Sequence, residues 1–516
     1  MYMMETRRDY TNLKILGIGT KGEITKKVRN LIDQKLYVIK QLGTQKLFDS
    51  QKEILKLLEE NKCQFIVKHY SNDDRDDEII TEFIENGDLH DYMTTNMDLE
   101  EPIEEKILWK IFYQCLESVN YLHKNNIIHR NIRLENIYVT DDMDIKLGNF
   151  RYSTYKNNLE EAMYYPEDGM FYKNGDALNN NIYNEYSDLY ALGVVFYQLC
   201  FYEFPFDIIE QEGKYELKRN PEKKTDYSND IINFINQLLT GQKPNIKELY
   251  DIVVHKFIET NISENMIESS LRCFCSFRSF TDFLTDQNKS DPKYLYENDS
   301  DFETTSNIIK SCIYFQFKEK IGDKIVSNYK DYINEIKKLF VKKFEIKNGQ
   351  APKIIDIIKF IFEKYKQEVG NKLSVNENIV NLCKKNRIME ISDISSMLKD
   401  LKFNYKIIPR YFVISLINNN QCQLDSKMKF LTKFKDEETN KNYILAGYVI
   451  KKIIDGKEQY IPIYLKEKEN ELDYRSSEGN KIQKIDEQNL FDNSEGTIEV
   501  IFYKKVTSRE SNVPQN

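Results

Sequence analysis

The sequence predicts an α+β protein with two or three packed domains. Its 516 residues are more than one hydrophobic core usually organises. Strand-like and helix-like segments alternate through the first half, whereas the second half is rich in helix and then rich in strand. Hydrophobic residues make up 41% of the chain, and glycine and proline number only 18 and 10, so we expect folded structure nearly throughout.

The first half contains strand, turn and helix patterns in a fixed order. Strands are predicted at 13–17, 25–30, 35–41 and 78–83, and further short ones within 127–139 and at 145–147. Helices are predicted around 54–58 and at 104–123, 228–240 and 245–258. Residues 186–202 are apolar all round, which is typical of a helix buried on every side.

The second half begins near residue 259 without a linker rich in Pro, Gly or Ser. Helix is predicted from about 265 to 401, and strands at 404–417, 442–452, 459–466 and 497–505. Asp455-Gly456 is a hairpin signal between the second and third of these strands. The predicted domains are therefore 1–258 and 259–506, packed together, followed by a flexible tail at 507–516.

The charge distribution argues against a nucleic-acid partner. The chain carries 74 basic and 83 acidic residues, which gives a net charge of −9. Residues 1–258 carry 32 basic and 44 acidic side chains, and residues 259–516 carry 42 and 39. Because a nucleic-acid-binding domain normally has a net basic face, we expect no such partner.

Cysteine spacing and hydropathy indicate the compartment. The eight cysteines show no C-x-x-C pairs of the kind that hold zinc, and no disulfide framework. The longest apolar stretch, around 192–202, is far shorter than the ~20 residues that span a bilayer. The N-terminus has no apolar signal core. We therefore expect a soluble, cytoplasmic protein with no membrane partner.

Residue types that bind nucleotide phosphates occur in order in the first half. Gly17-Ile-Gly-Thr-Lys-Gly22 lies between two predicted strands, where glycines let the backbone approach phosphate oxygens. Lys40 ends the third strand and Glu53 lies on the next helix, as in a lysine held by a carboxylate and directed at phosphates. Ile128-His-Arg-Asn-Ile-Arg-Leu-Glu-Asn136 and Ile145-Lys-Leu-Gly-Asn-Phe-Arg151 follow.

In this order and spacing, the motifs resemble the eukaryotic protein kinase family over residues 10–258. The resemblance extends to Tyr165-Pro-Glu167 and to 187–193 in the buried helix. It implies a bilobal, protein kinase-like fold for this region. It also implies a nucleotide-binding site made of Gly17, Gly19, Gly22, Lys40, Glu53 and Asn136.

Two positions depart from the family's pattern. Asn131 stands where the family has the aspartate that orients the substrate hydroxyl, and an amide cannot take the proton of that hydroxyl. Asn149 stands where the family has the aspartate that binds Mg²⁺, and a neutral amide is a weaker ligand for a hard cation. The resemblance then implies weak, Mg²⁺-independent ATP binding and no metal site. The alternative is a structural Lys40–Glu53 ion pair in a cleft that binds no nucleotide.

The second half resembles the ubiquitin-specific protease family of papain-like cysteine peptidases. Four blocks occur in that family's order, at 264–274, 348–360, 407–415 and 443–464 together with 496–504. This resemblance implies a papain-like α+β domain in which Asn265 replaces the nucleophilic cysteine and Gln459 replaces the histidine. No histidine follows residue 255, so the imidazole that activates a thiol protease is missing from this half.

The expected function is therefore that of a non-catalytic scaffold, a pseudokinase joined to an inactive protease-like domain. Its expected partners are proteins, with ubiquitin or a ubiquitin-like protein implied by the second resemblance. One alternative is a residual Ser/Thr protein kinase with unorthodox catalytic residues, which the retained glycine loop and Lys40 favour. Further alternatives are a deubiquitinase and a structural component of a large assembly.

Overall fold

The computed structural model describes most of the first half and parts of the second half of the chain. The described residues are 9–18, 23–42, 49–60, 63–70, 77–156, 167–211, 214–220, 226–240, 244–274, 329–346, 349–369, 379–381, 411–415, 433–436, 441–454, 457–468, 471–478, 481–485 and 497–505. The expected tail at 507–516 lies outside them. Within the described residues, no helix combines the length and the apolar character that crossing a membrane requires.

The chain divides into two compact units. The first comprises Met1–Thr260 with Ile346–Gln350, and the second comprises Asn261–Glu345 with Ala351–Asn516. Each unit is described separately below.

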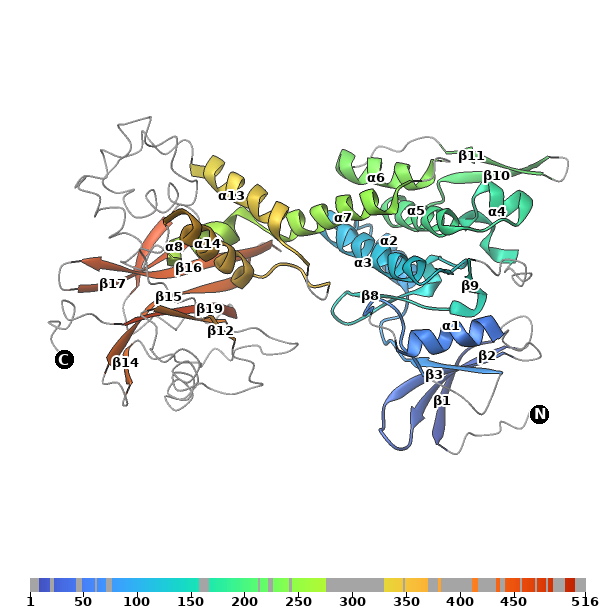
Figure 1. Cartoon of the computed structure of the whole chain (residues 1–516), viewed down its shortest axis with the longest axis horizontal. Helices are drawn as coiled ribbons and strands as arrows, with labels where there is room; N and C mark the ends of the chain where they lie inside the picture. The colour runs from blue at the N-terminus through green and yellow to red at the C-terminus, as the bar shows by residue number, and fades with distance from the viewer. Residues whose placement is uncertain are drawn as a thin grey trace. The chain divides into compact units, whose positions relative to one another are not determined.

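The first unit begins with a five-stranded antiparallel sheet and one helix (Figure 1). The strands are β1 (Tyr10–Ile18), β2 (Ile24–Asn30), β3 (Leu36–Gln41), β4 (His69–Tyr70) and β5 (Glu78–Glu82), in the spatial order β1-β2-β3-β5-β4. Helix α1 (Asp49–Glu59) follows β3. Alternate side chains of β2, β3 and β5 form one small core of Val28, Tyr37, Ile39 and Ile80, as the period of two along a strand requires.

The rest of the first unit is mainly helical. Its helices are α2 (Leu89–Asp98), α3 (Glu105–Lys124), α4 (Gly175–Asn180), α5 (Glu185–Phe201), α6 (Asn229–Leu239) and α7 (Ile246–Asn261). Helix α5 is buried on all sides, which confirms the prediction from its apolar sequence. Its Phe196 stacks on Phe112 of α3 with ring centroids 3.9 Å apart, so α3 and α5 share one aromatic core.

Short strands and 3₁₀ turns connect the sheet to these helices. They are β6 (Ile127–Ile128), η1 (Leu134–Asn136), β7 (Ile137–Val139), β8 (Ile145–Leu147), η2 (Phe150–Tyr152), β9 (Thr154–Tyr155) and η4 (Glu167–Tyr172). The antiparallel hairpin of β10 (Phe206–Gln211) and β11 (Lys214–Arg219) was not predicted. Its strands are partly or fully exposed on both faces, so they lack the apolar alternation by which a strand is recognised in a sequence.

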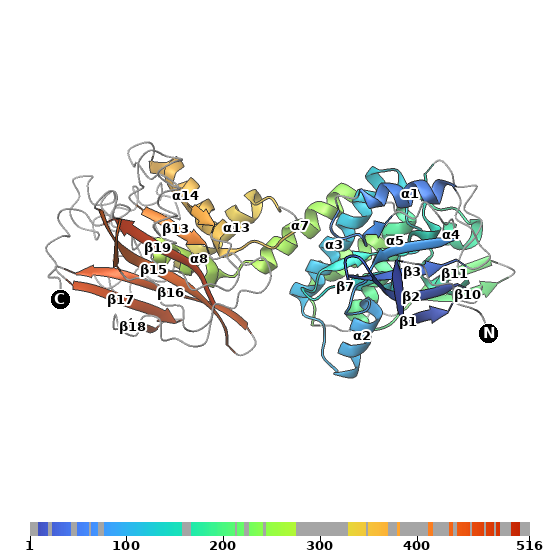
Figure 2. The same ribbon diagram turned by 90° about the horizontal axis from the view of Figure 1, so that it is seen from below.

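The second unit combines helices with a large mixed sheet. The helices are α8 (Glu264–Phe274), α13 (Tyr329–Lys343) and α14 (Ile354–Val369), which Figure 1 shows gathered next to the sheet. The strands are β12 (Ile379–Asn381), β13 (Tyr411–Ser415), β14 (Lys433–Asp436), β15 (Lys441–Ile454), β16 (Lys457–Lys468), β17 (Glu471–Glu478), β18 (Lys481–Ile485) and β19 (Thr497–Lys505). Their order is β12-β13-β19-β15-β16-β17-β18, with β14 paired to β15. Figure 2 shows β19, β15, β16, β17 and β18 side by side in this sheet.

The described residues of the second unit agree with the predicted change from helix to strand, although strands β14, β17 and β18 were not predicted. Strand β12 falls inside the stretch predicted as helix and pairs in parallel with β13. Ile454 pairs with Lys457, which confirms a hairpin between β15 and β16. The described part of this unit is an α+β arrangement, and it leaves the papain-like identity of the fold a prediction.

Candidate active site

The loop 129–136, which joins β6 to β7 and includes η1, is anchored by a buried carboxylate of α5. Asp188 accepts hydrogen bonds from the backbone N–H groups of His129 at 2.9 Å and Arg130 at 2.8 Å, and its Oδ2 lies 2.9 Å from Nε2 of His123. Burial alone would raise the pKa of Asp188, but the His123 hydrogen bond and the other polar contacts lower it overall. Arg130 has a left-handed φ of 67°, an uncommon conformation that these bonds stabilise.

His129 has a structural role in this loop. Its Nδ1 accepts the backbone N–H of Asn131 at 3.2 Å, and its Nε2 donates to the carbonyl oxygen of Gly148 at 2.9 Å. The ring is fully buried, and burial lowers its pKa, which favours the neutral form. His129 therefore connects the loop to the residue that precedes Asn149, as expected of a core histidine.

Four of the predicted site residues form one chain of hydrogen bonds. Lys40 Nζ donates to Asn149 Oδ1 at 3.4 Å, and Asn149 Nδ2 donates to Asn136 Oδ1 at 2.9 Å. Asn136 Nδ2 then donates to the backbone carbonyl oxygen of Asn131 at 2.7 Å. This series of hydrogen bonds runs from β3 of the sheet, past the end of β8, into the loop 129–136. It holds residues that are far apart in the sequence close to Lys40, whose pKa is lowered by burial.

The structure corrects the predicted partner of Lys40. Glu53 is exposed on α1, and the described contact of Lys40 Nζ is with Asn149 and not with Glu53. Helix α1 contacts η2 and β9, and this packing leaves Glu53 on the solvent side of the helix. Glu53 therefore lies outside the hydrogen-bonded site.

The predicted glycine loop is described only at its first glycine. Gly17 pairs with Thr25 of β2 next to a register shift in β1. A Cβ atom added to Gly17 would meet no described atom within 4 Å, so a ligand can approach this backbone closely. Gly19 and Gly22 lie outside the described residues.

An ion pair at the edge of the site was missed by sequence reasoning. Arg151 Nη1 binds Glu23 Oε1, and the two side chains are only 9% and 15% exposed. Glu23 directly precedes β2, so the pair connects the end of the predicted glycine loop to the turn η2. Burial lowers the pKa of Arg151. The two charges are 128 positions apart, and nothing in a single sequence links them.

The donor atoms of the site do not match those that Mg²⁺ usually takes from a protein, namely one or two carboxylates that act together with phosphates and water. The candidate donors here are the amides of Asn136 and Asn149, and the oxygen of each already accepts a hydrogen bond. Among the described residues, His and acidic side chains cluster at metal-ligand spacing only at Asp88, His90 and Asp91, where Asp88 caps α2. The described residues thus supply no conventional Mg²⁺ site next to Lys40.

In the second unit, Asn265 contacts the residue that follows Gln459, and the described contacts do not join Asn265 to Gln459 itself. Asn265 Oδ1 accepts the backbone N–H of Tyr460, which directly follows Gln459 on β16. Ser269 Oγ, one turn along α8, donates to the carbonyl oxygen of Tyr460 at 2.7 Å. Cys273 is fully buried, and burial raises the pKa of its thiol, so it is no candidate nucleophile.

Comparisons with known proteins identify the first unit. Residues 10–258 match the family model of the protein kinase domain. Serine/threonine-protein kinase Nek2 of Homo sapiens is 26% identical over 270 residues, which cover 48% of this chain and 60% of that protein. Probable serine/threonine-protein kinase nek2 of Dictyostelium discoideum is 24% identical over 277 residues, which cover 50% of this chain and 65% of that protein. The match therefore spans less than two thirds of either relative.

These comparisons contradict one expectation drawn from Asn131 and Asn149 and leave another without support. The expected non-catalytic scaffold, a pseudokinase, is wrong because the relatives are named as serine/threonine-protein kinases, which are enzymes. Mg²⁺-independent ATP binding gains no support, since protein kinase domains use ATP generally with Mg²⁺. The family match ends at residue 258 and gives no support to the protease resemblance. Residues 10–258 of this chain form a protein kinase domain, and its relatives include kinases of the Nek family.

Proposed function

We propose that the first unit is a Ser/Thr protein kinase that transfers the γ-phosphoryl group of ATP to protein hydroxyls with unorthodox residues at two catalytic positions. The observation that carries this proposal is the hydrogen-bond chain from Lys40 through Asn149 and Asn136 to the backbone of Asn131. It joins a phosphate-binding cation to the loop where the substrate hydroxyl would lie. The names of the relatives support the same reaction and acceptor class.

Phosphoryl transfer tolerates the loss of a strong base better than many reactions do. Its transition state is loose in most descriptions, so positioning and electrostatic stabilisation supply most of the catalysis. Lys40 is partly buried, and its positive charge interacts more strongly with phosphate oxygens there than it would in water. The amide oxygen of Asn131 can accept a hydrogen bond from the substrate hydroxyl and orient it. The proton then leaves to a phosphate oxygen or to water, so we expect turnover reduced by roughly 10²–10⁴ relative to a carboxylate at this position.

The experiment is transfer of radiolabelled phosphate from ATP to a mixed protein substrate by the full chain, with Mg²⁺, with Mn²⁺ and with chelator. Phosphoserine or phosphothreonine in the product is the expected result. Lys40→Ala should remove this activity, whereas Lys35→Ala, at an exposed lysine just before β3, should keep it. The proposal fails if wild-type protein incorporates no phosphate under any metal condition, or if Lys40→Ala retains full activity.

We further propose that the second unit binds a protein partner, with ubiquitin or a ubiquitin-like protein as the class that the protease resemblance implies. The observation in favour is the contact of Asn265 with the backbone of Tyr460, because it packs α8 and β16, the elements that carry Asn265 and Gln459, against each other. Neither amide side chain can act as a thiolate or as its base, so binding without cleavage is expected.

The corresponding test uses the full chain with immobilised ubiquitin and with a ubiquitin–fluorophore substrate. Saturable binding without fluorophore release is the expected result. Release of the fluorophore would contradict the assignment of Asn265 and Gln459, and lack of binding to ubiquitin would exclude this partner.

A further inference from the structure

The segment Ile346–Gln350 belongs to the first unit, although it follows the family match at 10–258 in the sequence. Its Gly349 has a left-handed φ of 63° and lies against Phe65. A Cβ atom added to Gly349 would lie 2.2 Å from Cζ of Phe65 and 2.5 Å from Nε2 of Gln64. The backbone conformation and the close approach therefore both require glycine at this position.

Phe65 is itself held firmly in the core of the first unit. Its side chain is 2% exposed, and its ring packs edge-on against the ring of Tyr113 in α3, with centroids 6.1 Å apart. Its carbonyl oxygen accepts the hydroxyl of Ser118, also in α3, at 2.8 Å. Because protein interiors are close-packed, a larger residue at 349 cannot be accommodated by a free movement of this ring.

The backbone around Phe65 pairs with the end of β8. The N–H of Leu147 donates to the carbonyl oxygen of Phe65 at 2.8 Å, and the N–H of Val67 donates to the carbonyl oxygen of Leu147 at 2.9 Å. A Cβ atom added to Gly148 would lie 2.9 Å from Cγ2 of Val67, so these two residues are also in contact. The segment 65–67 therefore holds both residues that precede Asn149.

The residue after Asn149 is held from the same part of the chain. The ring of Phe150 lies 5.3 Å from that of His69 in β4, centroid to centroid. His69 is buried, and burial lowers its pKa to about 4, so the ring is neutral and packs without a charge. Asn149 itself has a left-handed φ of 61°, a conformation that its surroundings must maintain. The segment 65–69 supplies contacts on both sides of it.

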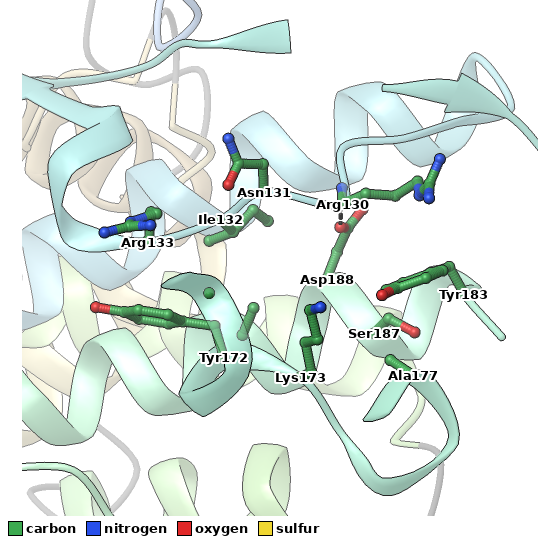
Figure 3. A pocket seen from close by; sticks show the side chains of 12 residues that line it. Arg130, Asn131, Ile132, Arg133, Tyr172, Lys173, Ala177, Tyr183, Ser187 and Asp188 are labelled. Atoms are coloured by element: carbon green, nitrogen blue, oxygen red, sulfur yellow. Dashed lines mark hydrogen bonds between the residues drawn. The ribbon is translucent and has the colours of Figure 1, made fainter. Parts of the chain in front are cut away.

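The hydrogen bonds that start at Asn149 end beside a pocket. Asn136 joins Asn149 to the backbone of Asn131, and Asn131 lines a pocket whose empty volume, including the part open to solvent, is about 380 Å³. Figure 3 shows Asn131 on the loop along one side of this pocket. A displacement of Asn149 would therefore be felt both at Lys40 and where the proposed kinase would hold the acceptor hydroxyl.

We propose that Gly349 is a positioning residue of the kinase site. Its contact with Phe65 fixes the segment 65–69, and this segment keeps Asn149 in place to bind Lys40. The working kinase domain thus includes a segment that lies outside the family match. The proposal rests on the proposed kinase function, because it assigns a role in the same site.

The first measurement is amide hydrogen exchange in the full chain, without nucleotide, for the wild type and for Gly349→Ala. The N–H groups of Val67, Leu147 and Gly148 are hydrogen-bonded, so they should exchange slowly in the wild type. In Gly349→Ala we expect them to exchange roughly tenfold faster, because a Cβ atom is unfavourable in the left-handed conformation and would collide with Phe65. The amides of α5 should stay as protected as in the wild type.

Two further variants separate this contact from a general loss of stability. Gly175→Ala adds the same methyl group at the start of α4, where the backbone is not left-handed and no described atom lies within 4 Å, so exchange should be unchanged. Phe65→Leu removes the ring atom closest to Gly349. Adding Gly349→Ala to Phe65→Leu should therefore accelerate exchange less than adding it to the wild type.

The second measurement is phosphate transfer at a temperature where all variants are folded. We expect Gly349→Ala to transfer roughly 10–10²-fold more slowly, since a displacement of about 1 Å caused far from the chemistry can cost 10²-fold. In the Phe65→Leu background the loss should be smaller.

Unchanged exchange at Leu147 and Gly148 in Gly349→Ala would overturn the proposal. Equal acceleration throughout α5 would also overturn it, because the role of Gly349 would then be purely structural, as would full transfer by Gly349→Ala in an active kinase. Locally faster exchange in a protein whose wild type transfers no phosphate would support the positioning of Asn149 and count only against the kinase function.

Discussion

Replacing Asn131 by aspartate should accelerate phosphate transfer by a large factor. The described hydrogen bonds of Asn131 are made by its backbone, whose N–H donates to His129 Nδ1 at 3.2 Å and whose carbonyl accepts from Asn136 at 2.7 Å. Neither bond depends on the side chain, so the loop should keep its geometry in the variant. A positioned proton acceptor typically contributes ~10²–10⁴ in rate. At 1.36 kcal/mol per factor of ten, that corresponds to about 3–5 kcal/mol of transition-state stabilisation.

The assay is initial-rate transfer of radiolabelled phosphate from ATP by Asn131→Asp and by the wild type. The gain should appear in kcat, and it should be lost at acidic pH because only the ionised carboxylate accepts a proton. Adding Lys40→Ala to the variant should abolish the gain. Asn229→Asp, at an exposed position in the first turn of α6, controls for the added charge.

One result would refute the reasoning about the missing base. If Asn131→Asp binds ATP as tightly as the wild type and transfers phosphate no faster, proton acceptance does not limit the proposed transfer. Positioning by Lys40 and Asn149 would then have to account for the whole rate of the reaction.

Three further predictions concern stability. Asp188→Asn should lower the free energy of unfolding by about 2–4 kcal/mol at pH 7, because hydrogen bonds to a charged group are lost. Since the pKa of Asp188 is lowered in the folded state, this difference between variant and wild type should shrink below about pH 4. A difference that stays constant across pH in chemical denaturation would contradict the assignment. Glu23→Gln should cost about 2 kcal/mol in thermal unfolding because Arg151 keeps a largely buried charge, and an unchanged midpoint would show that the pair is not formed. Ser269→Ala should destabilise the second unit by about 1–2 kcal/mol because the buried hydrogen bond from the Ser269 hydroxyl to the carbonyl oxygen of Tyr460 is lost, whereas an unchanged denaturation profile would argue against that contact.

The kinase domain could be predicted from the sequence because its motifs are local and ordered. A glycine loop, a lysine at a strand end and the loop 129–136 each have a short signature, and their order restricts the fold. The partner of Lys40 could not be predicted in the same way. It depends on how α1 packs against η2 and β9, and this packing leaves Glu53 exposed and makes Asn149 the hydrogen-bond acceptor.

The expected non-catalytic scaffold was wrong because it treated the side-chain amides of Asn131 and Asn149 as sufficient to abolish catalysis. Asn131 and Asn149 bear on proton transfer and metal binding in the proposed reaction, but the loop that carries Asn131 is held by a buried carboxylate and by backbone groups, as the contacts of Asp188 show. The two amides therefore do not by themselves exclude the proposed phosphate transfer.

The ion pair of Glu23 and Arg151 restricts how two distant segments can move. Glu23 directly precedes β2, and Arg151 lies in the turn η2. Because the two side chains are only 9% and 15% exposed, these segments can separate only by breaking a largely buried ion pair, which is costly. The pair therefore acts as a clasp between the strand β2 and the turn that follows β8.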